Sequence, residues 1–171
     1  SSVAPFEGCV FGSGNAAATG DVAVKNSTAT VNIVGGHIYE NVYGGANTSI
    51  VYGATYTNIG TKAVNRTGLR VNDLIVDGTV FGGGESNAEG KEEYDFEFKS
   101  VIGSIDINID GTGYIPSGLK FQLTGSIFGS GNASSSQGTS RISVKKLGEK
   151  EKPSRNLSFQ RTDLLTIDCE K

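Results

Sequence analysis

The chain has 171 residues, of which 25 are glycine and only 3 are proline, and its formal net charge is −3. A charge so close to neutral gives no indication of binding to nucleic acid or to an anionic membrane. Apolar runs stay well short of the roughly 20 residues that span a bilayer, so membrane insertion is not predicted. The glycine content, roughly twice the usual value of about 7%, is typical of short strands joined by glycine turns.

Runs of alternating apolar and polar residues predict a series of strands. In chain order they are DVAVKN (21–26), TATVNIVGGHI (28–38), LRVNDLIVDG (69–78), VIGSIDINIDG (101–111), LKFQLTG (119–125), SRISVKK (140–146), NLSFQR (156–161) and LLTIDC (164–169). Ile105, Ile107 and Ile109, for example, alternate with polar residues, which is the pattern of a half-buried strand. A helical period of 3.6 residues is not seen, so the chain is predicted to be all-β.

A six-residue glycine motif occurs four times, as VFGSGN (10–15), VYGGAN (42–47), VFGGGE (80–85) and IFGSGN (127–132). Repeats of unequal length, each with about three strands, predict a parallel β-helix, or β-solenoid, of about four irregular coils with loop excursions. Residues 1–171 are expected to form one such segment, excerpted from a larger protein. The alternative is an antiparallel β-sandwich, although only Asp77-Gly78 and Asp110-Gly111 resemble two-residue hairpin turns.

Three positions of the glycine motif have a structural interpretation. The first residue (Val10, Val42, Val80 or Ile127) is expected to point into the core. The third, always glycine, is expected at a corner where a left-handed or closely approached backbone excludes a β-carbon. Asn15, Asn47, Glu85 and Asn132 at the sixth position are expected to stack on one another.

Two sets of aromatic residues are candidate partner-binding sites. The second motif position forms one set, which either packs or forms an exposed column that serves as a ligand platform: Phe11, Tyr43, Phe81 and Phe128. The second set lies on one face of the excursion at 90–100: Tyr94, Phe96 and Phe98. That excursion and the charged loop at 145–155 are either solvated loops or partner-contact surfaces.

Motifs for cofactor, metal or catalytic chemistry are weak. The glycine motif lacks the following helix and the Gly-Lys-Ser/Thr of a phosphate loop, so no cofactor is predicted. DINIDG (106–111) matches the start of a calcium loop, but Ser117 stands where the bidentate Glu is required. His37 is the single histidine, and no Gly-x-Ser-x-Gly occurs. Cys9 and Cys169 are expected to lie too far apart to form a disulfide.

The segments GTVFGGGES, ENVYGGANTS and GSIFGSGNAS resemble the glycine-rich β-helical repeats of large bacterial surface and adhesin-like proteins, notably of gut Firmicutes and Bacteroidetes. The resemblance covers essentially the whole chain and rests on scaffold residues. It implies an extracellular protein, either attached to the bacterial cell surface or secreted. The long third and fourth repeats depart from regular members.

The expected function is that of a non-enzymatic adhesin or binding module. Its partner is expected to be a host protein, such as immunoglobulin or mucin, or an extended glycan, with further repeats of the same chain on either side. Two alternatives stay open at this point: a fragment of a β-helical carbohydrate-active enzyme, and a structural stalk without a ligand of its own.

Overall fold

The structure is a computed structural model that describes residues 8–60, 72–85, 99–111, 114 and 118–145, together with the backbone of 164–168. Over these ranges the chain forms strands and turns but no helix, which confirms the all-β prediction. The described residues therefore contain no helix that could cross a bilayer.

The named strands of the described residues form four sheets, and neighbouring strands in every sheet are parallel. The motif sheet contains β1 (Val10–Phe11), β4 (Val42–Tyr43), β7 (Val80–Phe81) and β11 (Ile127–Phe128). The five-stranded sheet contains β2 (Ser27–Ile33), β5 (Gly53–Ile59), β9 (Ile105–Asp110), β13 (Ser140–Lys145) and β14 (Leu164–Asp168). The three-stranded sheet contains β3 (Gly36–Ile38), β6 (Leu74–Val76) and β10 (Phe121–Leu123), and the two-stranded sheet contains β8 (Lys99–Ile102) and β12 (Ser135–Gln137).

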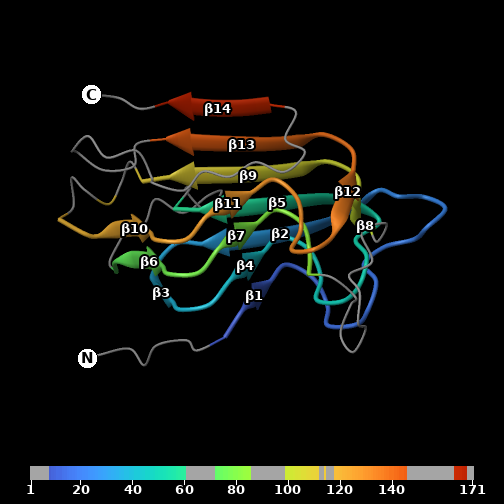
Figure 1. The fold of residues 1–171 in the computed structure, drawn as a ribbon, viewed down its shortest axis with the longest axis horizontal. Coiled ribbons are helices and arrows are strands. Elements are labelled where there is room, and N and C mark those ends of the chain that lie inside the picture. Colours follow the sequence, from blue (N-terminus) through green and yellow to red (C-terminus); the bar gives the residue numbers. More distant parts are fainter. Residues whose placement is uncertain are drawn as a thin grey trace.

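The chain visits the sheets in a fixed order. After each motif strand the chain forms a strand of the five-stranded sheet, preceded in the third and fourth repeats by a strand of the two-stranded sheet. The first three repeats then add a strand of the three-stranded sheet before the next motif strand begins. Apart from β13 and β14, which both follow β11, strands that lie side by side therefore come from successive repeats, and Figure 1 shows them stacked from the N-terminal to the C-terminal end. The parallel pairing does not agree with the antiparallel sandwich alternative.

The apolar core lies between the sheets and follows the alternation in the sequence. In the five-stranded sheet Ile33, Ile59 and Ile109 are paired in register, and all three are buried. Ile38 and Val76 of the three-stranded sheet join the same core. Because a slip of one residue would turn these side chains to the solvent, the pattern strongly specifies the register.

The glycine motif behaves as predicted at its first and third positions. Val42 and Val80 are buried in the core and pair in register with Val10 and Ile127. A β-carbon on Gly12 would lie 2.3 Å from the carbonyl oxygen of Gly44. At Gly12 and Gly44 the third position therefore excludes side chains because the neighbouring backbone approaches closely, and at Gly82 because the Ile105 side chain packs there. None of these three glycines has a left-handed conformation.

The predicted strand at residues 21–26 is wrong, because this segment is a turn. The carboxylate of Asp21 accepts hydrogen bonds from the backbone N–H groups of Ala23 (2.6 Å) and Val24 (3.3 Å). Hydrogen bonds between an aspartate side chain and the backbone N–H groups that follow it in the chain compete with strand pairing. Val22 and Val24 are consequently 60% and 61% exposed rather than buried. The predicted strand at 156–161 and Cys169 lie outside the described residues.

Candidate functional site

The aromatic residues at the second motif position form one continuous column. The rings of Phe11 and Tyr43 stack with centroids 4.6 Å apart and an interplanar angle of 4°. The Tyr43–Phe81 and Phe81–Phe128 pairs stack in the same way, at 5.0 Å and 5.2 Å. Alternation along each strand places this column on the face of the motif sheet opposite the core valines.

The column is packed at its centre and more accessible at its ends. Tyr43 is fully buried and Phe81 is 8% exposed, whereas Phe11 and Phe128 are half-buried. Stacking between successive rings explains why all four copies of the motif have an aromatic residue at this position. Contact of these four rings with a partner stays a prediction, and Phe11 and Phe128 have more exposed ring surface to offer than the two inner rings.

A polar cluster covers the hydroxyl end of Tyr43. Asn41 Nδ2 donates to the Tyr43 hydroxyl over 3.2 Å, and this hydroxyl donates to Glu85 Oε1 over 3.2 Å. Asn132 Nδ2 completes the cluster, 3.4 Å from Glu85 Oε1. Burial is the main cause that raises the pKa of Tyr43 to about 12; the hydrogen bond from Asn41 opposes it, and the nearby Glu85 carboxylate adds a smaller upward effect. This phenol is therefore held neutral by its surroundings.

The stacking predicted for the sixth motif position is present in two pairs. Asn15 and Asn47 form a bridge, and Asn47 Nδ2 donates to Asn15 Oδ1 over 2.9 Å. Glu85 and Asn132 form the second bridge. Cys9, next to this region, carries a free thiol whose pKa is raised, chiefly by burial.

The remaining predicted site residues either lie outside the described residues or belong to the calcium-like motif. Tyr94, Phe96 and Phe98 lie outside the described residues, and so does the charged loop after Lys145. Of the calcium-like motif, Asp106 lies 3.8 Å from Arg141, and Asn108 is bonded to another asparagine. Ile107 and Ile109 of the same motif are core residues. The motif is thus part of β9 within the five-stranded sheet.

The outer face of the three-stranded sheet carries a second group of functional side chains, which we call the ledge. Its members are His37, Tyr39, Asp77, Gln122 and Thr124. His37 Nε2 donates to Asp77 Oδ2 over 2.6 Å, and the imidazole stacks on Tyr39 with centroids 3.9 Å apart. The Thr124 hydroxyl donates to the other carboxylate oxygen of Asp77 over 3.2 Å. Residues from three repeats therefore converge on one carboxylate.

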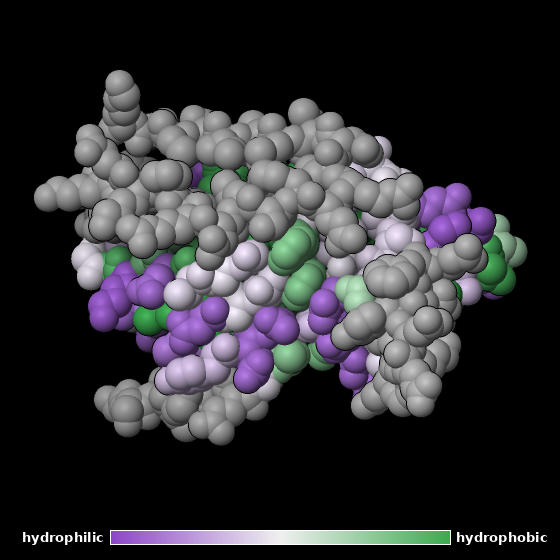
Figure 2. All heavy atoms as spheres, viewed as in Figure 1, coloured by the Kyte–Doolittle hydropathy of each residue, from purple (hydrophilic) through white to green (hydrophobic). Residues whose placement is uncertain are grey.

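The ledge is open to solvent and presents both ring surface and hydrogen-bonding groups. Tyr39 is 42% exposed, and the side chains of His37 and Asp77 are 32% and 37% exposed. An amide, Gln122 Nε2, lies 3.3 Å from the Thr124 hydroxyl. In the view of Figure 2, hydrophilic and hydrophobic residues intermingle over the coloured surface, without a broad hydrophobic area among them. The ledge suits a partner that offers hydroxyl groups beside a flat apolar face.

The order of the hydrogen bonds in the ledge differs from that of a nucleophile with its base. The carboxylate of Asp77 stands between the Thr124 hydroxyl and the His37 imidazole. In a catalytic triad the imidazole occupies the middle and takes the proton of the hydroxyl. The ledge as it stands therefore orients an imidazole without activating a hydroxyl.

Sequence reasoning noted His37 only as the single histidine and did not find the ledge. The sequence did contain a pattern that points to it, since Asp77 and Thr124 each follow an apolar strand directly and each stand immediately before a glycine. The sequence did not show that those strand ends pair with one another.

Across the described ranges, no group of three or more His, Cys, Asp and Glu side chains could hold a metal ion. Comparison with family models, curated proteins and solved structures gives no match.

Proposed function

We propose that this chain is a parallel β-helix segment of a bacterial surface protein, and that it acts there as a non-enzymatic binding module. The β-helix assignment is supported by the order in which successive repeats add parallel strands to the motif sheet and to the five-stranded sheet. In-register stacking at Val10, Val42, Val80 and Ile127 supports it further. The resemblance of the glycine motif to repeats of adhesin-like proteins supports the extracellular location.

The ledge is the observation that carries the binding function. Its side chains project from paired strands, a rigid support that limits the conformational entropy lost when a partner binds. Tyr39 and His37 present a stacked pair of rings, and Asp77, Thr124 and Gln122 present carboxylate, hydroxyl and amide groups beside it. The partner that this chemistry favours is an extended glycan, such as those displayed on host mucin.

The binding experiment uses the full chain against immobilised mucin glycans, with immunoglobulin as a second surface. The Tyr39→Ala variant is expected to lower affinity for the glycans at least about tenfold, since burial of a large side chain against a partner contributes about 1.5–3 kcal/mol. Tyr56→Ala is the matched control, because Tyr56 lies on the outer face of the five-stranded sheet.

Three results would redirect the proposal. Equal weakening by Tyr39→Ala and Tyr56→Ala would show that the ledge is not the contact surface. Binding to immunoglobulin that is lost when Tyr94, Phe96 and Phe98 are changed to Ser would place recognition on the 90–100 excursion. Release of reducing sugars or unsaturated products from a polysaccharide panel would instead indicate a carbohydrate-active enzyme.

A further inference from the structure

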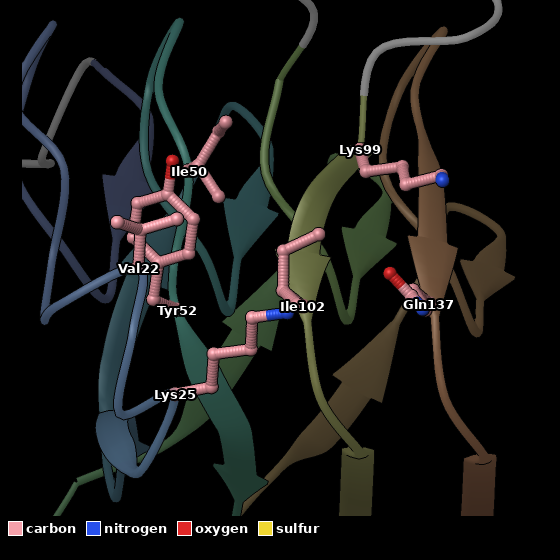
Figure 3. A pocket seen from close by; sticks show the side chains of 7 residues that line it. All are labelled: Val22, Lys25, Ile50, Tyr52, Lys99, Ile102 and Gln137. Atoms are coloured by element: carbon pink, nitrogen blue, oxygen red, sulfur yellow. The ribbon is translucent and has the colours of Figure 1, made fainter.

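A hollow of about 370 Å³ lies beside the two-stranded sheet. Figure 1 shows this sheet, β8 and β12, on the opposite side of the molecule from the three-stranded sheet that carries the ledge. Its walls come from four levels of the stack: the turn before β2, the segment leading into β5, strand β8 and strand β12. Figure 3 shows the residues that line it, namely Val22, Lys25, Ile50, Tyr52, Lys99, Ile102 and Gln137.

The hollow is positively charged within an acidic chain. Among the described residues it is lined by two ammonium groups, from Lys25 and Lys99, and by no carboxylate. Ion pairs within the described residues join His37 to Asp77 and Arg141 to Asp106, so neither lysine is part of one there. Two cations that have no neutralising partner among the described residues favour an anionic occupant.

The backbone before β2 holds Lys25 in place. Its N–H group donates to the backbone carbonyl of Asp21 over 2.9 Å, within the turn that the Asp21 carboxylate also stabilises. Lys25 itself has φ = 54°, a left-handed conformation that a lysine rarely adopts. In Figure 3 its side chain extends across the hollow towards Ile102, while Lys99 and Gln137 lie on the far side.

The remaining lining is apolar, aromatic and amide. Val22, Ile50 and Tyr52 lie together on one side of the hollow, and Ile102 lies between them and Gln137. A phenol ring with aliphatic neighbours accepts the C–H face of a sugar ring, and an amide can bond to sugar hydroxyls. Cation, ring and amide occur here around one concave surface.

We propose that this hollow binds an acidic sugar residue of a glycan, with its carboxylate held by Lys25 or Lys99 and its ring placed against Tyr52. The volume lies at the lower end of the roughly 300–1,000 Å³ of small-molecule pockets. It fits a residue of a chain better than a folded protein, which needs about 1,000 Å² of interface. An acidic peptide would satisfy the charges but has no ring face for Tyr52.

Titration calorimetry or NMR with trigalacturonate tests this site on the full chain. Trigalacturonate is expected to bind, and the Lys25→Gly, Lys99→Ala double variant is expected to lower affinity at least about tenfold, as loss of two charge contacts implies. Glycine at 25 keeps the left-handed turn, so the fold is retained. Lys25→Arg with Lys99→Arg keeps the charges and is expected to stay within about threefold of wild type. Lys120→Ala, an exposed lysine outside the hollow, is the control.

Two further ligands test whether binding requires the carboxylates and whether it requires a sugar ring. A neutral galactose trimer is expected to bind at least about tenfold more weakly than trigalacturonate, since it lacks the carboxylates. Hexaglutamate that binds as tightly as trigalacturonate would overturn the sugar assignment, and so would trigalacturonate binding that the double lysine variant leaves unchanged. The ligands and variants differ from those of the ledge experiment, so either site can fail while the other stands.

Discussion

The amide group of Asn108 donates a hydrogen bond to the amide oxygen of Asn58 over 2.9 Å, and Asn58 donates in the same way to Asn32. The three residues are paired in register on β9, β5 and β2. They form a ladder on the outer face of the five-stranded sheet, opposite the core isoleucines. Asn58 makes two of these bonds, whereas Asn32 makes one.

Replacement of Asn58 by Ala is therefore expected to cost more than replacement of Asn32. We expect a loss of about 1–2 kcal/mol in the free energy of unfolding for Asn58→Ala and about half of that for Asn32→Ala, at roughly 1 kcal/mol per hydrogen bond. Urea denaturation measures both. Thr30→Ala, on the same outer face of β2, is the control, and equal losses at 32 and 58 would contradict a continuous ladder.

Substitution at Gly44 tests the close approach of successive motif strands. A β-carbon there would lie 2.4 Å from both the carbonyl oxygen of Gly82 and Oγ1 of Thr57. Gly44→Ala is expected to lower the unfolding free energy by at least about 2 kcal/mol, because paired backbones cannot move apart without losing hydrogen bonds.

Gly35→Ala is the matched control for this substitution. At Gly35 the nearest atom to an added β-carbon is the side-chain carbon of Asn72, at 3.3 Å, and Asn72 is exposed. We expect a change below about 1 kcal/mol there, in the range of ordinary surface substitutions. Thermal melts followed by circular dichroism would show the difference, and a Gly44→Ala protein as stable as Gly35→Ala would refute the close approach.

Stability at alkaline pH is expected to depend on Tyr43. Its pKa in the folded chain is raised to about 12, so folding favours the protonated phenol. The resulting stabilisation is complete below the unfolded value of about 10 and is lost as the pH rises from there towards 12. In Tyr43→Phe this loss should be absent. Urea denaturation of both proteins between about pH 9 and 11 measures it, and parallel declines would show that Tyr43 is not the group concerned.

The aromatic column predicts a difference between its inner and outer rings. Phe81 stacks on two rings and Phe128 on one among the described contacts. Since each aromatic pair contributes about 0.5–1.5 kcal/mol beyond its buried area, Phe81→Leu should destabilise by about twice as much as Phe128→Leu. Chemical denaturation of the two variants provides the comparison, and a larger loss at Phe128 would contradict the stacking order.

The strands that could be predicted were those with apolar residues on the inward side. β9 has Ile105, Ile107 and Ile109 on its inner face, and its pattern predicted the strand directly. β5 was not predicted, because two of its inward positions are Thr55 and Thr57. These hydroxyl residues are buried next to the glycines of the motif sheet, where Thr55 Oγ1 donates to the Gly82 carbonyl over 2.7 Å.

The candidate sites depend on contacts between repeats, which the spacing of a sequence does not give. The aromatic column could be predicted as a set because all four rings occupy the same motif position. The ledge could not, since His37 and Asp77 stand 40 residues apart and meet only through the pairing of β3 with β6. The turn at 21–25 was misread for the opposite reason, as its valines alternate like a strand although Asp21 bonds locally.

The stacking order also determines how the molecule responds to tension. β1 and β14 lie at opposite ends of the stack, and the hydrogen bonds between neighbouring strands run along it (Figure 1). A force that pulls these two ends apart therefore acts on these bonds in series, and every pair of neighbouring strands carries the same tension. The end strands are bonded on one side only, so we expect them to detach before the inner strands and the chain to lengthen one strand at a time.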